Sequence, residues 1–156
     1  MLNTILSWQQ VMNKNQLLQS NNQKMVFTNG CFDVLHVGHV RYLKEAKACG
    51  DFLLVAINTD ESVKRLKGSS RPVFTLQDRA EVLSALSCVD AIVSFEQDTP
   101  LKLLNCLQPP IYVKGGDYTK ERLPEYPVVS AYGGKVYCLS FYEGYSSSNI
   151  INRSSS

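Results

Sequence analysis

The chain contains two histidines, His36 and His39, which are separated by Val37 and Gly38. If a helix begins here, both imidazoles face the same side of its first turn, beside backbone N–H groups that lack helical partners and beside the positive end of the helix dipole. Gly30 permits a close approach of the backbone, and Gly38 leaves room between the two rings. Such a turn favours an oxygen-rich anion, so the pattern predicts a phosphate site.

Two other interpretations fit the histidine pair. The two rings can cap a helix without binding a ligand, or they can ligate zinc, although no third ligand is suggested at a suitable helical spacing. The five cysteines are odd in number and widely spaced, without a C-x-x-C pair, which indicates reduced thiols. We therefore predict no protein metal site.

A second group of charged residues follows an apolar run at residues 52–57. A charge run of this kind is typical of a solvated helix face, but it can also form a cationic flap over phosphates, and the following Gly-Ser-Ser at residues 68–70 would let the flap close. The group consists of Asp60, Lys64, Arg65, Lys67 and Arg71, with Arg79 at the start of the next expected helix.

Two further segments could hold a nucleotide. The first is Lys114, Gly115, Gly116 and Asp117, where the glycines let the backbone approach a base or a ribose. A plain tight turn explains the glycines alone, but not the charged residues beside them. The second segment, Ser146, Ser147 and Ser148, suits either an ordinary helix N-cap or the oxygens of a triphosphate.

Alternating strands and helices are expected to position these segments. Short apolar runs predict strands at residues 24–28, 52–57, 91–93, 111–113 and 136–139, and helical patterns lie at 3–20, 40–49, from 75 onward, 101–107 and 128–132. Strands separated by helices need right-handed crossovers, so we predict a three-layer α/β, Rossmann-like fold with a five-stranded parallel sheet and an added N-terminal helix. Ligands then bind beyond the carboxyl ends of the strands.

Length and composition limit the function classes. The 156 residues suit about one domain, which we divide into an N-terminal helical appendage (1–23), a catalytic domain (24–153) and a disordered tail (154–156). A net charge of +2 gives no global field for nucleic acid or an anionic membrane, and no apolar run approaches the length of a membrane span. The amino terminus lacks a signal-peptide pattern, so we expect a cytoplasmic protein.

The motifs resemble those of a known enzyme superfamily. The H-x-G-H element at residues 36–39 is similar to the signature of the nucleotidyltransferases that include the cytidylyltransferases. Longer stretches, at residues 28–36, 58–72 and 113–118, resemble the D-glycero-β-D-manno-heptose 1-phosphate adenylyltransferase family over nearly the whole chain. That family has Ser-Thr-Thr where this chain has three serines, and Phe141-Tyr142 replaces the Arg-Thr pair usual in glycerol 3-phosphate cytidylyltransferases, which favours the heptose branch.

The resemblance assigns roles to the residues singled out above. It implies catalytic roles for His36, His39, Lys67 and Arg79. It implies nucleotide binding by Asn29, Gly30, Cys31, Phe32, Asp33, Gly38, Lys114, Gly115, Asp117, Ser146, Ser147 and Ser148. Substrate binding falls to Asp60, Lys64, Arg71 and Tyr118. We further expect the cluster Lys64, Arg65, Lys67, Arg71, Arg79 and Lys114 to converge on one polyphosphate.

The implied reaction joins ATP and D-glycero-β-D-manno-heptose 1-phosphate to give ADP-heptose, a precursor of the lipopolysaccharide core or of surface glycans, and pyrophosphate. The nucleophile is an ionised phosphate oxygen, so the step needs alignment and charge neutralisation rather than a general base. Mg²⁺ should arrive with ATP. Two alternatives stay open, a CTP-dependent cytidylyltransferase of a polyol phosphate such as glycerol 3-phosphate, and a nucleotide-binding module without catalysis.

The same resemblance implies particular partners. We expect a homodimer that binds ATP and a sugar 1-phosphate, and neither nucleic acid nor a membrane. In many members of the family the domain is fused to a sugar kinase, and 156 residues are too few to contain one as well. We therefore expect a separate heptose kinase to supply the substrate, or this sequence to be one part of a longer kinase fusion.

Overall fold

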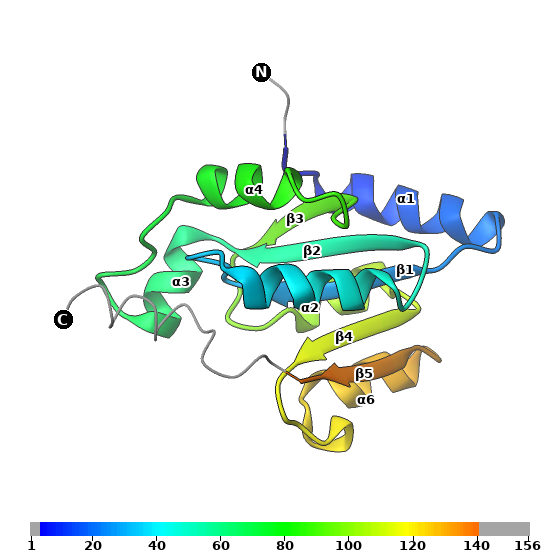
Figure 1. Ribbon diagram of the computed structural model, residues 1–156. Coiled ribbons are helices and arrows are strands. Elements are labelled where there is room, and N and C mark those ends of the chain that lie inside the picture. Colours follow the sequence, from blue (N-terminus) through cyan, green and yellow to red (C-terminus); the bar gives the residue numbers. More distant parts are fainter. Residues whose placement is uncertain (1–3, 141–156) are drawn as a thin grey trace.

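The computed structural model describes residues 4–140 and forms a five-stranded sheet with helices on both faces (Figure 1). The strands are β1 (Met25–Gly30), β2 (Phe52–Asn58), β3 (Ala91–Phe95), β4 (Ile111–Gly115) and β5 (Lys135–Leu139). The helices are α1 (Trp8–Ser20), α2 (Val37–Lys47), α3 (Asp60–Lys67), α4 (Leu76–Ser84), α5 (Leu101–Leu107) and α6 (Glu125–Ala131), with a short 3₁₀ helix, η1 (Lys120–Arg122). All paired strands are parallel, in the order β3-β2-β1-β4-β5, which confirms the predicted Rossmann-like architecture.

Two apolar layers, one on each face of the sheet, explain the unbroken apolar run of β2. Its alternate residues point to opposite faces, so Leu53, Val55 and Ile57 join the core under α2 and α4, while Leu54 and Ala56 join the core under α1, α5 and α6. All five side chains are fully buried. A strand covered on both faces needs apolar residues at every position, which is why its sequence does not alternate.

The N-terminal segment is tied into the sheet edge and the core. Leu6 forms a parallel bridge to Val93 and donates its N–H to the carbonyl of Ile92 at 2.8 Å. The indole of Trp8 donates to the Ser94 carbonyl at 2.9 Å. These bonds cover the otherwise open edge of β3. Helix α1 packs against α5 in the core layer that contains Leu54 and Ala56. The helix is thus part of the main core in this structure; the predicted domain boundary at residue 23 stays a prediction.

Helix starts follow ordinary capping chemistry, but two of them differ from the expected positions. Thr75, where the predicted helical pattern begins, caps α4 by accepting a hydrogen bond from the N–H of Asp78. However, α2 begins at residue 37 rather than near 39–40, because His36 acts as its cap. Likewise α6 begins at Glu125 rather than at Val128. Residues 60–67 form the regular helix α3, which fits the solvated-helix interpretation of the charge run, and the flap over phosphates stays a prediction. Among residues 4–140, no helix is long and apolar enough to cross a membrane.

Candidate active site

The strand order predicts a ligand crevice at the carboxyl ends of β1 and β4. From β1 the chain continues to β2 and β3 on one side, then crosses over to β4 and β5 on the other. The connections that leave β1 and β4 therefore diverge, and the gap between them is the usual ligand position in an open parallel sheet. Three of the predicted segments follow the carboxyl ends of strands β1, β2 and β4, so they lie on the same side of the sheet.

The two histidines form a capping box at the start of α2. His36 is the N-cap, and its Nδ1 accepts a hydrogen bond from the Gly38 N–H at 3.1 Å. The N–H of His36 in turn donates to Nδ1 of His39 at 3.3 Å. The two rings stack with centroids 3.8 Å apart. The pair therefore does what Ser and Glu do in an ordinary capping box, with imidazoles that retain a second nitrogen.

This geometry fixes the tautomer of each imidazole. A backbone N–H can only donate, so Nδ1 of both His36 and His39 must be unprotonated, and each neutral ring carries its proton on Nε2. Burial lowers the pKa of His36, and burial together with the charge of His36 lowers the pKa of His39 to about 4. At neutral pH the pair thus offers two Nε2–H donors beside the N-terminal end of α2, an arrangement suited to phosphate oxygens.

Gly30 is required by the aromatic ring that packs over it. A Cβ at this position would lie 2.8 Å from the Phe32 ring. Phe32 has a positive φ of 48°, which turns its side chain back over the end of β1. The ring is buried, with its centroid 5.2 Å from that of His39. The loop after β1 therefore packs directly against the histidine pair and holds it in place.

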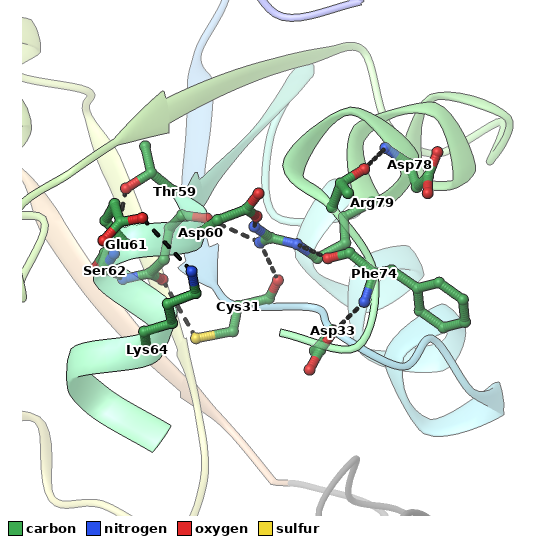
Figure 2. Close-up of polar contacts among 12 residues, drawn as sticks. Cys31, Asp33, Thr59, Asp60, Glu61, Ser62, Lys64, Phe74, Asp78 and Arg79 are labelled. Atoms are coloured by element: carbon green, nitrogen blue, oxygen red, sulfur yellow. Dashed lines mark hydrogen bonds and ion pairs between the residues drawn. The ribbon is translucent and has the colours of Figure 1, made fainter. Parts of the chain in front are cut away.

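Arg79 makes polar contacts with residues of four different segments (Figure 2). Its guanidinium donates to the carbonyls of Cys31 and Asn58, each at 2.8 Å, and to Oδ1 of Asp60 at 2.8 Å. Its Nε donates to the Phe74 carbonyl at 3.1 Å. The side chain is 1% exposed. Arg79 thereby ties the ends of β1 and β2 to the start of α3, and its direct contact with a triphosphate stays a prediction.

Asp33 fastens the segment before α4 to the loop after β1. Its carboxylate accepts from Arg71 Nε at 2.5 Å and from the N–H groups of Val73 and Phe74 at 2.8–3.0 Å. Burial raises the pKa of Asp33, but the hydrogen bonds from Phe74 and Val73 and the Arg71 partner outweigh it, so the net shift is downward. Both members of this ion pair are buried. Asp33 and Arg71 thus contact each other in this structure, and their predicted ligand contacts remain predictions.

The other cations of the second segment lie on α3. Lys64 pairs with Glu61 at 3.6 Å, and Arg65 pairs with Asp98 at 2.9 Å, so both are engaged on the exposed face of the helix. Lys67, at the end of α3, lowers the pKa of the Cys31 thiol, although burial outweighs it and the net shift is upward. Of the six cations expected to converge, Lys67 alone has no ion pair within residues 4–140.

The β4 side of the crevice carries the third segment. Lys114 Nζ lies 3.9 Å from Oε1 of Glu125, a buried residue at the start of α6. Asn29, at the end of β1, accepts a hydrogen bond at 2.8 Å from the hydroxyl of Tyr112. Gly115 is buried at the end of β4, and Asp117 and Tyr118 are exposed in the turn that follows. Ser146, Ser147, Ser148 and the expected tail 154–156 lie outside the described residues.

Several residues of the site were missed by sequence reasoning. Thr28 and Tyr42 share a 2.6 Å hydrogen bond, and both contact the Val113 carbonyl, which links β1, α2 and β4. Asn58 donates to Ser62 and anchors α3. A polar residue at the end of the apolar β2 run could have indicated Asn58, but no sequence signal marked the others. All five cysteines are free, and residues 4–140 contain no group of three or more His, Cys, Asp or Glu side chains placed to hold a metal ion.

Comparisons with known proteins identify the family of the chain and relatives that share its fold. The profile of the cytidylyltransferase-like family matches residues 27–153. The chain belongs to this family. As a cytidylyltransferase-like protein it is similar to a crystal structure described as the lipopolysaccharide core biosynthesis protein from Thermoplasma volcanium, with 29% identity and a TM-score of 0.62 over 80% of this chain and 99% of that one.

Other relatives share its sequence or its fold. The bifunctional protein HldE of Geotalea uraniireducens is 52% identical over 86% of this chain, and that of Hydrogenovibrio crunogenus is 54% identical over 88%. The cytidylyltransferase-like chain spans only 28% and 29% of the length of these two relatives. A pantoate-beta-alanine ligase from Francisella tularensis shares the fold, with 16% identity and a TM-score of 0.60 over 87% of this chain and 67% of that one.

Proposed function

We propose that this cytidylyltransferase-like protein is a nucleotidyltransferase that transfers AMP from ATP to D-glycero-β-D-manno-heptose 1-phosphate, giving ADP-heptose and pyrophosphate. The observation that carries the proposal is the histidine capping box at the crevice between β1 and β4. It presents two Nε2–H donors and a helix N-terminus where a triphosphate would lie.

The chemistry of the site suits phosphoryl transfer between two anions. The attacking oxygen belongs to a phosphate that is ionised at neutral pH, so no general base is needed. Charge develops on the α-phosphoryl oxygens and on the leaving pyrophosphate, where preorganised donors such as those of His36 and His39 lower the barrier. The Cys31 thiol, whose pKa burial raises, is not an activated nucleophile. These features favour a direct displacement without a covalent enzyme intermediate.

Lys67 and Lys114 are the cations best placed to reach the substrates. Lys67 is exposed near Cys31, and Lys114 is held by a 3.9 Å ion pair, longer than a hydrogen bond. Either side chain can swing onto an anion at little cost. We further propose that Mg²⁺ enters as part of the MgATP substrate, because a triphosphate supplies several of its oxygen ligands.

Relatives support the choice of heptose. The HldE proteins are about half identical to this chain, and a structural relative is described as a lipopolysaccharide core biosynthesis protein. The relatives are called bifunctional and are more than three times as long, so we propose that a heptose kinase acts before this domain. A homodimer and a cytoplasmic location belong to the same proposal. The preference for adenine over cytosine rests on the family resemblance.

A pyrophosphate-release assay tests the proposal directly. It crosses ATP and CTP with heptose 1-phosphate and glycerol 3-phosphate. We expect turnover with ATP and heptose 1-phosphate. Turnover with CTP and glycerol 3-phosphate would establish the cytidylyltransferase alternative, and nucleotide binding without pyrophosphate release would establish the non-catalytic one.

A matched pair of variants tests the histidines. His36→Asn keeps an N-cap acceptor for the Gly38 N–H but removes the Nε2–H donor, and His36→Ala removes both. We expect kcat to fall by about 10²–10³ in each variant, as for the loss of one preorganised donor, while only the alanine variant loses the cap. Unchanged turnover in His36→Asn would refute the proposed role.

A further inference from the structure

Glu125 is a buried carboxylate that the proposed mechanism does not use. Its side chain is 5% exposed, and its Oε1 lies 3.9 Å from Lys114 Nζ. Within residues 4–140, its buried Oε2 has no hydrogen-bond partner. A carboxylate taken out of water is costly unless donors surround it. Glu125 therefore has acceptor capacity that this part of the fold leaves unfilled.

Glu125 lies against β4, next to residues that contact β1. It begins α6 and lies against Lys114, the residue that leads into the Gly-Gly turn after β4. Tyr112, two residues earlier on β4, donates to Asn29 at the end of β1. Burial raises the pKa of Tyr112, and the nearby charge of Glu125 and a hydrogen bond between the two side chains raise it further. Glu125 thus lies beside the polar residues that join β1 to β4.

The chemistry of a carboxylate limits what it can bind here. It repels phosphate oxygens, so Glu125 is unsuited to the triphosphate itself. It accepts hydrogen bonds from neutral donors, and its two oxygens can accept from two neighbouring hydroxyls. Both substrates of the proposed reaction carry such hydroxyls, on the ribose of the nucleotide and on the sugar of the sugar phosphate. When Lys114 moves onto a phosphate, the carboxylate is left facing a hydroxyl-bearing group.

We propose that Glu125 is a specificity residue that accepts a hydrogen bond from a sugar hydroxyl of one substrate, either the ribose or the acceptor sugar. This inference rests on the proposed function. Lys114 serves as the neighbour that binds the charged part of the same substrate. No bond to the protein forms or breaks in this role, and Glu125 acts only in recognition.

The experiment compares full and deoxy substrates in three proteins. The substrates are ATP, 2′-deoxy-ATP, 3′-deoxy-ATP, and heptose 1-phosphate with analogues that each lack one hydroxyl. The proteins are the wild type, Glu125→Gln, and Glu121→Gln, a control in which the same change is made at an exposed glutamate of η1. The nucleotide and sugar series separate the two possible sources of the hydroxyl.

The expected result is non-additive. In the wild type, loss of the recognised hydroxyl should lower kcat/KM about ten- to a hundredfold, the usual cost of leaving a charged acceptor without its donor. Glu125→Gln should lose a similar factor with the full substrate and little more with that deoxy substrate. Glu121→Gln should behave as the wild type does.

Two results would overturn the inference. One is a wild type that does not discriminate against any deoxy substrate, a result that does not depend on the variant folding. The other is an equal deoxy penalty in the wild type and Glu125→Gln. If no substrate pair gives turnover, the proposed function fails separately. Calorimetric binding of ATP, the deoxy-ATPs and the sugar phosphates then decides the role of Glu125 by the same comparison.

Discussion

The histidine capping box should make the protein sensitive to mild acid. The folded state holds His39 with a pKa of about 4, below its ordinary value of 6.5, because burial and the charge of His36 disfavour the protonated ring. As the pH falls from 6.5 towards 4, the unfolded chain therefore binds a proton that the folded chain does not. The free energy of unfolding must fall over that range, and the stability is fully present above it. His36, whose pKa is also lowered, adds to the effect.

The size of the effect follows from the two pKa values. For His39 alone, linkage gives a loss of about 2 kcal/mol between pH 7 and pH 5 and about 3 kcal/mol by pH 4. A double variant, His36→Asn with His39→Gln, removes both titrating rings but keeps an acceptor at each capping position. Between pH 7 and pH 5, the free energy of unfolding of the double variant should therefore fall by about 2 kcal/mol less than that of the wild type.

Urea unfolding of both proteins at a series of pH values measures this difference. The contribution of Asp33 does not interfere, since its lowered pKa makes it act below pH 4, and it is present in both proteins. Parallel pH profiles for the wild type and the double variant between pH 7 and pH 5 would refute the assigned tautomers and the burial of the pair. A wild-type free energy of unfolding that rises as the pH falls would refute the predicted direction of the pH dependence.

Three further predictions follow from single contacts. Asn15→Ala should lower the free energy of unfolding by about 1–3 kcal/mol in urea, because the buried carbonyl of Leu107 loses its 2.9 Å donor. Arg79→Lys should cost a similar amount or more by the same assay, since one ammonium cannot reach all four acceptors; an unchanged stability would contradict its bridging role. Gly30→Ala should displace the Phe32 ring, costing about 1–3 kcal/mol, and weaken ATP binding in calorimetry.

Much of the fold was predictable because its signals are local. The apolar run at residues 52–57, the Thr75 cap and the 101–107 helix all appear in the structure within a residue or two of their predicted bounds. A strand buried on both faces must be apolar throughout, and a helix start must satisfy its own N–H groups, so both leave marks in the sequence. The boundary of α2 shifted because a histidine took the place of the usual capping residue.

The sequence by itself determined which residues lie at the strand ends, and it placed the His36–His39 pair after β1 and Lys114 at the end of β4. Only the tertiary structure decided which charged side chains pair with one another. Arg71 and Arg79, whose ligand contacts stay predictions, pair with Asp33 and Asp60, and Glu125 lies beside Lys114 without any sequence signal. Pairings of this kind depend on distances between segments far apart in the chain, and a buried charge takes whichever partner packing brings within reach.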